Sequence, residues 1–269
     1  MFVNWGLEAR KWQISVASIS RISFIQAFKA ILSGVSFSVT TPNRMGEYLG
    51  RMLYMPEGSR LKSISVTLVG SLSQLIITFY SGIAGLIILN KQLVGQGILN
   101  EVAYRFGLSA LCVITIVLTV VYLWVKIIEN AFEKWLKNSR YLYLIESLRS
   151  FNVQLLLNLL LLSFLRYLVF IVQYFLLFSL FDVVLPLPVV WSVVSVLFLA
   201  MAVIPTIALA EVGLRGEISI QLMALFTTNT LGVGIASVTI WLINLVLPAM
   251  VGSVLFLSIK VFKRKNETV

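Results

Sequence analysis

Long runs of apolar residues leave this chain few possible folds. Residues 64–89, 106–128 and 152–181 are almost wholly apolar, and each exceeds the roughly 20 residues that a helix needs to cross a bilayer. With 59% hydrophobic and only 12% charged residues, the 269-residue chain lacks the polar side chains to cover a soluble domain. A membrane β-barrel would instead need segments of about ten residues with alternating polarity. We therefore predict an all-α, polytopic integral membrane helical bundle.

Three other apolar stretches are less regular. Residues 189–210 are interrupted by Pro205, and residues 218–259 are long enough for one span and a shorter piece. Residues 22–40 end just before Pro42 and form a poor span on their own. We expect this last stretch to be a re-entrant or interfacial helix.

The N-terminal segment, residues 1–21, is basic and contains Trp5 and Trp12. These features are more typical of an interfacial helix than of a cleaved leader. Because the chain opens within this amphipathic segment, we expect one or two further helices upstream.

Lysine and arginine are unevenly distributed. Residues 1–63, the linker 129–150 and the C-terminal tail are rich in them, whereas residues 90–105 and 182–188 are not. Since cytoplasmic loops carry an excess of Lys and Arg, we predict a plasma (inner) membrane protein with both termini and the linker in the cytoplasm. The net charge of +10 then indicates basic loops near anionic lipids and no nucleic-acid partner.

Two places in the chain share a pattern of proline, glutamate five or six residues later, and arginine four residues beyond it, with glycines nearby. Broken helices at corresponding places in two halves indicate a transporter site near the bilayer midplane. We predict one transmembrane domain, 1–269, with pseudo-repeated halves (about 1–128 and 151–269) and inverted, Pro-broken or re-entrant elements. The residues of the pattern are Pro42, Glu47 and Arg51, then Pro205, Glu211 and Arg215, with Gly46, Gly50 and Gly213 as the neighbouring glycines.

The first of these elements is predicted to be a helix from about residue 42 to 54. Thr41 is a suitable N-cap, and Pro42 fits the first helical position.

On that helix, one face would carry charged side chains and the opposite face would carry glycines. Arg44, Glu47 and Arg51 would share an arc of about 60°. Gly46 and Gly50 would lie opposite, where their spacing permits close helix packing. Arg44 near a helix N-terminus favours a phosphate site. Glu47 and Arg51 taken alone favour an ordinary i,i+4 salt bridge, and it is the second pair after a second proline that supports a functional role.

Arg166 lies near the middle of the run 152–181. Placing an arginine there costs about 2.5–3.5 kcal/mol or more, so such residues usually face a cavity or a partner. Gln173 lies within about 20° of it on the helix. The alternative is a structural ion pair between Arg166 and either Glu47 or Glu211.

Cofactor chemistry has little support in the sequence. There is no histidine, and Cys112 is the only cysteine, so zinc sites built on these residues are excluded. No GxxxxGK[ST] motif for nucleotide binding is present. We expect no cofactor, metal or catalytic residue.

Four segments of the chain resemble a known family. They are NWGLEARKW (4–12), TPNRMGE (41–47), LRYLVFIVQ (165–173) and IPTIALAEVGLRG (204–216). They are similar to the motifs of the membrane domain of lysylphosphatidylglycerol synthases, a family that includes stand-alone, flippase-like proteins. The resemblance implies lipid translocation, while aminoacyl transfer belongs to a separate soluble domain whose composition is not found here. The motif positions that correspond are Pro42, Arg44, Gly46, Glu47, Arg166, Pro205 and Glu211.

The leading hypothesis is a flippase-like transporter of a charged or aminoacylated phospholipid, or of a polyprenyl-phosphate-linked lipid. The partners are then membrane lipids, and a homo-oligomer is possible. The arginines would neutralise the lipid phosphate, and Glu47 and Glu211 would pair with them or receive a cationic headgroup. The alternatives are a membrane enzyme that uses these glutamates as acid and base, or a regulatory subunit. An arginine beside each glutamate disfavours the enzyme, because it weakens a carboxylate as a base.

Overall fold

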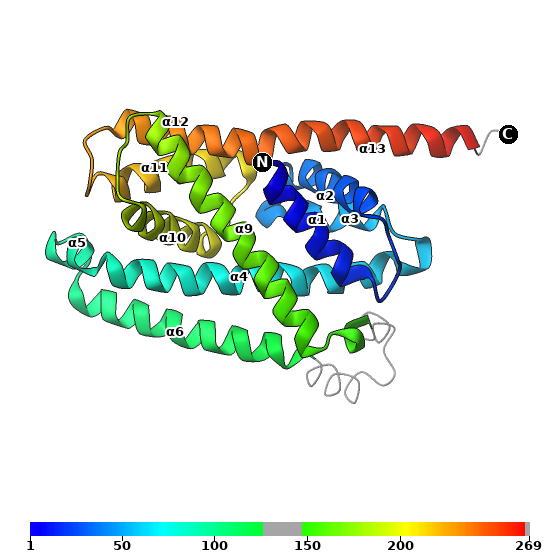
Figure 1. The fold of residues 1–269 in the computed structure, drawn as a ribbon, viewed down its shortest axis with the longest axis horizontal. Coiled ribbons are helices and arrows are strands. Elements are labelled where there is room, and N and C mark those ends of the chain that lie inside the picture. Colours follow the sequence, from blue (N-terminus) through cyan, green and yellow to red (C-terminus); the bar gives the residue numbers. More distant parts are fainter. Residues whose placement is uncertain (126–146, 267–269) are drawn as a thin grey trace.

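The computed structural model describes residues 1–125 and 147–266. Within these ranges every regular element is a helix, which confirms the predicted all-α fold (Figure 1). Four helices in the described part are long and apolar enough to cross a membrane, so the prediction of a polytopic membrane bundle is also confirmed. The four are Glu57–Ile88, Glu101–Leu123, Val153–Leu180 and Thr230–Leu257.

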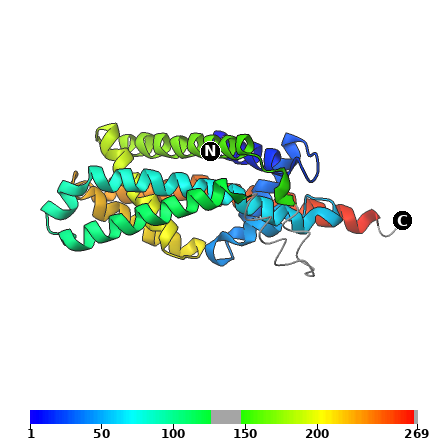
Figure 2. The ribbon, with the colours of Figure 1, turned by 90° about the horizontal axis from the view of Figure 1, so that it is seen from below.

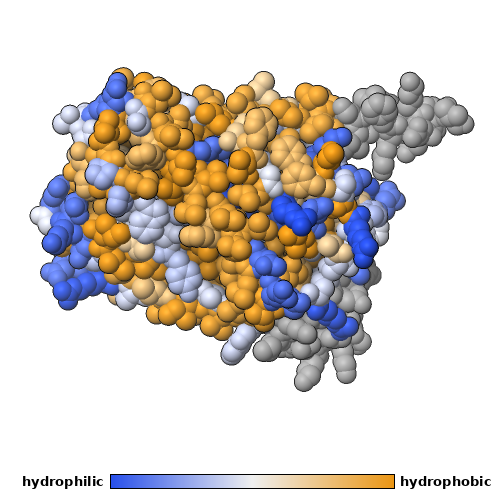
Figure 3. Space-filling view, in the orientation of Figure 1, coloured by the Kyte–Doolittle hydropathy of each residue, from blue (hydrophilic) through white to orange (hydrophobic). Residues whose placement is uncertain are grey.

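Long helices follow the long axis of the molecule. They are α4 (Arg60–Ile88), α6 (Glu101–Leu123) and a rod formed by α12 (Thr230–Trp241), a π-helical turn (Leu242–Val246) and α13 (Leu247–Asn266). Helix α9 (Val153–Leu180) crosses them obliquely (Figure 1), and the short α5 (Asn90–Gly95) links α4 to α6. The visible surface is apolar along the middle and hydrophilic toward both ends (Figure 3). This pattern fits helices that cross a bilayer from one polar end to the other.

A first helical hairpin consists of α2 (Phe24–Ser38), a 3-10 turn (Pro42–Arg44) and α3 (Gly46–Met52). Ser23 starts α2 with a capping box: its hydroxyl accepts from the Gln26 amide, and the Gln26 side chain accepts from the Ser23 amide. The helix predicted over 42–54 is wrong in detail, because Arg44 has a positive φ of 57° and interrupts it. The regular helix therefore begins only at Gly46.

A second helical hairpin consists of α10 (Leu187–Val203) and α11 (Ala208–Met223). Pro205 lacks an amide hydrogen and favours an extended residue before it, and Ile204 has the extended angles that end α10. The predicted span 189–210 is therefore divided between two helices. The predicted run 218–259 is divided as well, between the end of α11 and the rod.

The two hairpins lie along opposite ends of the same rod. Helix α2 packs against α13, whereas α11 packs against α12. Figure 1 shows the hairpins in opposite halves of the molecule, and their tips face each other near the middle of the long axis. The first hairpin contributes to one hydrophobic cluster and most of the second hairpin to another, while Ala208 of α11 belongs to the first cluster and α9 contributes to both.

The N-terminal helix α1 (Phe2–Val16) corrects one prediction. Its sequence predicts an interfacial helix, but one of its faces is buried against α2, α4 and α9, beside α9 in an outer layer of the bundle (Figure 2). Trp5 and Trp12 are each only 2% exposed. The polar side chains between them find buried partners on neighbouring helices, which allows a polar helix to lie in the core.

The predicted linker 129–150 falls largely outside the described residues. Its last four residues, Ser147–Ser150, form a 3-10 turn that leads into α9.

Candidate functional site

A cavity of about 610 Å³ lies between the two hairpin tips. Its walls come from α1, α4, α9, the π-helical turn and both hairpins. Seven ionisable side chains other than tyrosines line it: Glu8, Lys11, Arg44, Glu47, Arg166, Glu211 and Arg215. So many charges inside an apolar bundle require partners, and the structure provides them in two clusters.

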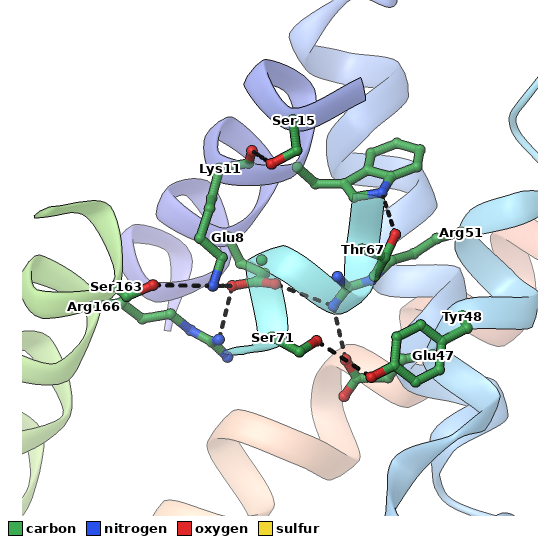
Figure 4. A network of polar contacts seen from close by, with 12 residues as sticks. Glu8, Lys11, Ser15, Glu47, Tyr48, Arg51, Thr67, Ser71, Ser163 and Arg166 are labelled. Carbon is green, nitrogen blue, oxygen red and sulfur yellow. Dashed lines mark hydrogen bonds and ion pairs between the residues drawn. The ribbon is translucent and has the colours of Figure 1, made fainter. Parts of the chain in front are cut away.

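The first cluster is centred on Glu8 of α1 (Figure 4). Its carboxylate lies 2.8 Å from Lys11 Nζ, 2.8 Å from Arg166 Nη1 and 3.2 Å from Arg51 Nη2. Arg51 also contacts Glu47 at 2.7 Å, so the i,i+4 pair of α3 is formed. Glu8 thus joins three elements of the fold, α1, α3 and α9, through one buried carboxylate.

Arg166 is held from several sides. Its Nε donates to Asn4 Oδ1 at 2.7 Å, and Asn4 donates in turn to Asn244 in the π-helical turn at 3.1 Å. Its guanidinium lies over the rings of Trp5 and Phe170, 5.3 and 5.7 Å from their centroids. The alternative interpretation of Arg166, a structural ion pair with Glu47 or Glu211, is wrong in its partner, since the carboxylate that Arg166 contacts is that of Glu8.

The second cluster joins the two hairpin tips. Arg44 donates through Nη2 to both carboxylate oxygens of Glu211 at 2.9 Å. Arg215 contacts the same carboxylate at 2.6 Å and donates to the hydroxyl of Tyr174 at 2.9 Å. Its guanidinium also lies 5.8 Å from the ring centroid of Phe198. Glu211 is thus shared by an arginine of its own helix and an arginine of the opposite hairpin.

The turn before α3 directs Arg44 toward that partner. The Thr41 hydroxyl accepts from the amide of Gly46 at 2.7 Å and donates to the carbonyl of Phe37 at 3.2 Å. Thr41 precedes the 3-10 turn that begins at Pro42 but makes no capping hydrogen bond to it, and its hydroxyl instead accepts from the first amide of α3. Between these points Arg44 adopts its left-handed conformation, which is uncommon for a residue other than glycine and is often found at functional sites.

Glycines bring the two arms of the first hairpin close together. A Cβ on Gly50 would lie 2.5 Å from the Cα of Gly34, and a Cβ on Gly46 would lie 2.1 Å from the carbonyl oxygen of Phe37. By contrast, a Cβ on Gly213 would meet no atom within 4 Å, so packing does not require a glycine there.

The remaining predicted residues occupy different positions. Pro205 lines the cavity at the break between α10 and α11. Arg51 lies behind the wall, buried between Glu8 and Glu47. Gln173 does not line the cavity, although it shares α9 with Arg166. The uncharged polar residues of the wall include Tyr48, Ser71, Gln74 and Thr78.

Sequence reasoning missed Glu8, Lys11 and Asn4 as site residues. The signal was present, because residues 4, 8, 11 and 15 are all polar and recur at intervals that place them on one helical face. The two tryptophans led instead to an interfacial interpretation. No group of three or more His, Cys, Asp or Glu residues that could hold a metal occurs in the part of the chain that the structure describes.

The four long apolar helices and the charged cavity between the two hairpins place this chain in a class, that of polytopic membrane proteins with an internal polar site. The chain belongs to the family of the lysylphosphatidylglycerol synthase TM region, whose model matches residues 1–252. This membership indicates a role connected with membrane lipids. No curated protein and no solved structure matches the chain.

Proposed function

We propose that this protein moves a phosphate-bearing lipid headgroup between the two leaflets of the membrane through the cavity between the hairpin tips. The observation that carries the proposal is the Arg44–Glu211 contact at 2.9 Å, which joins hairpins from opposite ends of the bundle inside a charged cavity. A headgroup that crosses about 30 Å of hydrocarbon needs polar groups along its path, because burying its charge without partners is costly.

The cavity has the chemistry that such a headgroup needs. Arg44, Arg166 and Arg215 line it, and guanidinium groups bind phosphate oxygens through charge-assisted hydrogen bonds. Gln74 supplies an acceptor for a hydroxyl group of the headgroup, since its buried Oε1 has no hydrogen-bond partner in the described residues. The apolar side chains of α10 at the mouth, such as Met201 and Val203, are compatible with acyl chains that remain in the bilayer.

The distribution of basic residues supports the orientation that belongs to this proposal. The end of the bundle where α4 begins carries Arg60, Lys62 and Arg149. The other end, where α5 lies and α6 begins, carries Lys91 and Arg105, offset by Glu101 and Asp182. By the excess of positive charge in cytoplasmic loops, the first end, where the C-terminus also lies (Figure 1), faces the cytoplasm of a plasma (inner) membrane. The N-terminus lies near the middle of the long axis, so its side of the membrane is not given by this end (Figure 1).

Leaflet exchange of fluorescent phospholipids in liposomes tests the proposal. The wild-type protein should accelerate exchange over protein-free liposomes, and Arg44→Gln should reduce it by about tenfold, because a charge-assisted contact is lost. Arg105→Gln is the matched control, since Arg105 forms an exposed pair with Glu101 on α6 and does not line the cavity.

Analysis of the same lipids by mass spectrometry separates the alternatives. Unchanged lipids with accelerated exchange support translocation. A new lipid product would support a membrane enzyme instead. A wild-type protein that matches the protein-free liposomes in both measurements would favour a regulatory subunit.

A further inference from the structure

The two clusters hold more positive than negative charge. Four arginines and one lysine meet three glutamates, which leaves an excess of two positive charges. Arginine does not lose its proton in proteins, so the four arginines alone exceed the three glutamates by one positive charge at any ordinary pH. The residues are Lys11, Arg44, Arg51, Arg166 and Arg215 against Glu8, Glu47 and Glu211. A cavity lined with an excess of one sign of charge favours a ligand of the other sign.

The two most buried carboxylates of the clusters, Glu8 and Glu211, are already engaged by two or more cations each. Glu8 contacts three cations, Glu211 contacts two arginines, and Glu47 contacts Arg51. The side chains of Glu8 and Glu211 are only 5% and 7% exposed. An incoming ammonium group could reach either one only by displacing an arginine, which would then be buried without its partner.

Two arginines that line the cavity have N–H groups that are not used in hydrogen bonds to the described part of the protein and can donate to a ligand. Arg44 uses Nη2 alone for Glu211, and its side chain is 38% exposed. Arg166 uses Nε for Asn4 and Nη1 for Glu8. Within the described residues, Nη1 of Arg44 and Nη2 of Arg166 make no hydrogen bond. A phosphate group, with several acceptor oxygens, matches these donors.

Three aromatic faces that could attract an ammonium group are also engaged. The rings of Trp5 and Phe170 lie beside the Arg166 guanidinium, and the ring of Phe198 lies beside that of Arg215. A second cation over the same faces would be repelled by the first.

From these contacts we infer that the cavity selects a lipid headgroup of net negative charge, a phosphate without a compensating amine, and discriminates against aminoacylated headgroups. The inference rests on the proposed translocation and narrows its substrate class. Phosphatidylglycerol, a phosphodiester, and a polyprenyl monophosphate share this chemistry. Lysyl-phosphatidylglycerol carries the same phosphodiester together with amino groups and is therefore the discriminating probe.

Competition in nanodiscs tests this selectivity apart from transport. The full chain is placed in phosphatidylcholine nanodiscs with a fluorescent phosphatidylglycerol, which is then displaced by each unlabelled lipid. We expect an anionic lipid to displace the probe at a concentration about tenfold lower than lysyl-phosphatidylglycerol, because like charges in one cavity repel. The better of the two anionic lipids identifies the monoester or the diester as the preferred source of the phosphate.

The variants make the test specific to the cavity. Arg44→Gln should weaken binding of the anionic probe by about fivefold or more, as expected for the loss of a charged hydrogen-bond donor, while Arg105→Gln should leave it unchanged. Displacement by lysyl-phosphatidylglycerol at an equal or lower concentration would overturn the inference, as would the absence of any saturable binding.

The two proposals fail in different ways. A protein that exchanges lysyl-phosphatidylglycerol between leaflets as fast as phosphatidylglycerol would contradict the charge selectivity and leave translocation intact. A protein that binds anionic lipid selectively but exchanges no lipid would contradict translocation and leave the selectivity intact.

Discussion

At the scale of single residues, Glu8 both lines the cavity and holds three helices together through its ion pairs. Its one carboxylate compensates Lys11, Arg51 and Arg166, which come from three different helices. All of these side chains are largely buried, so they are weakly hydrated and depend on one another. The first cluster therefore contributes to the stability of the fold as well as to the lining of the cavity.

The variant Glu8→Gln should destabilise the protein by about 3–5 kcal/mol, because it leaves buried cations without their carboxylate. Thermal unfolding in detergent micelles should show a clear loss of melting temperature. Glu101→Gln removes a carboxylate from an exposed pair and should leave the melting temperature nearly unchanged. Equal melting temperatures for the two variants would contradict the role given to Glu8.

Local spacing predicted some of these contacts but not others. The pairs Glu47–Arg51 and Glu211–Arg215 form as their i,i+4 spacing indicates. The partner of Arg166 could not be predicted in this way. Glu8 lies 158 positions away in the sequence, and only the packing of α1 against α9 brings the two together.

At the scale of elements, the first hairpin depends on glycine. Helices α2 and α3 approach so closely at Gly34 and Gly50 that a single added methyl group would overlap the opposite backbone. The close approach places Arg51 of α3 within reach of Glu8 and sets the position of the turn that carries Arg44. Small residues perform this role commonly in membrane helices.

The variant Gly50→Ala should therefore force α2 and α3 apart and lower the unfolding free energy by about 1–3 kcal/mol, the usual cost of overpacking. Gly213→Ala is the matched control on a helix, and it should be neutral or slightly stabilising, since alanine has the higher helix propensity. Chemical or thermal unfolding of both variants measures the difference. A loss of stability that is as large for Gly213→Ala would argue against the packing explanation.

Element boundaries were predictable where proline sets them. Pro205 divides α10 from α11, as its missing amide and its effect on the preceding residue require. The interruption at Arg44 was not predictable from local propensity, because a non-glycine residue with positive φ is held by surrounding contacts, here the Thr41 hydrogen bonds and the pairing with Glu211.

At the scale of the whole molecule, the apolar runs and their lengths were sufficient to predict a membrane bundle. They were not sufficient to place α1, whose burial depends on partners that come from distant segments. The arrangement of two halves and their orientation in the membrane remain predictions that labelling can test.

Cysteine labelling tests the orientation. In a Cys112→Ala background, Gln96→Cys should react in intact cells with a maleimide that does not cross membranes, because Gln96 is exposed at the end proposed to face outward. Gly58→Cys, exposed at the other end and free of packing clashes, should react only after the membrane is permeabilised. The reverse labelling pattern would invert the proposed orientation.

The contact between the hairpin tips is the centre of the account, and a pair of substitutions on α11 tests it most directly. Glu211 pairs with Arg44 across the cavity, whereas Glu217, two turns further along, is exposed and accepts only from Gln221 among the described residues. The measurement is leaflet exchange of phosphatidylglycerol in liposomes that contain equal amounts of folded wild type, Glu211→Gln or Glu217→Gln. The account predicts exchange about tenfold slower for Glu211→Gln and unchanged for Glu217→Gln, because only the first leaves two arginines in the cavity without their carboxylate. Equal exchange by all three proteins would contradict it.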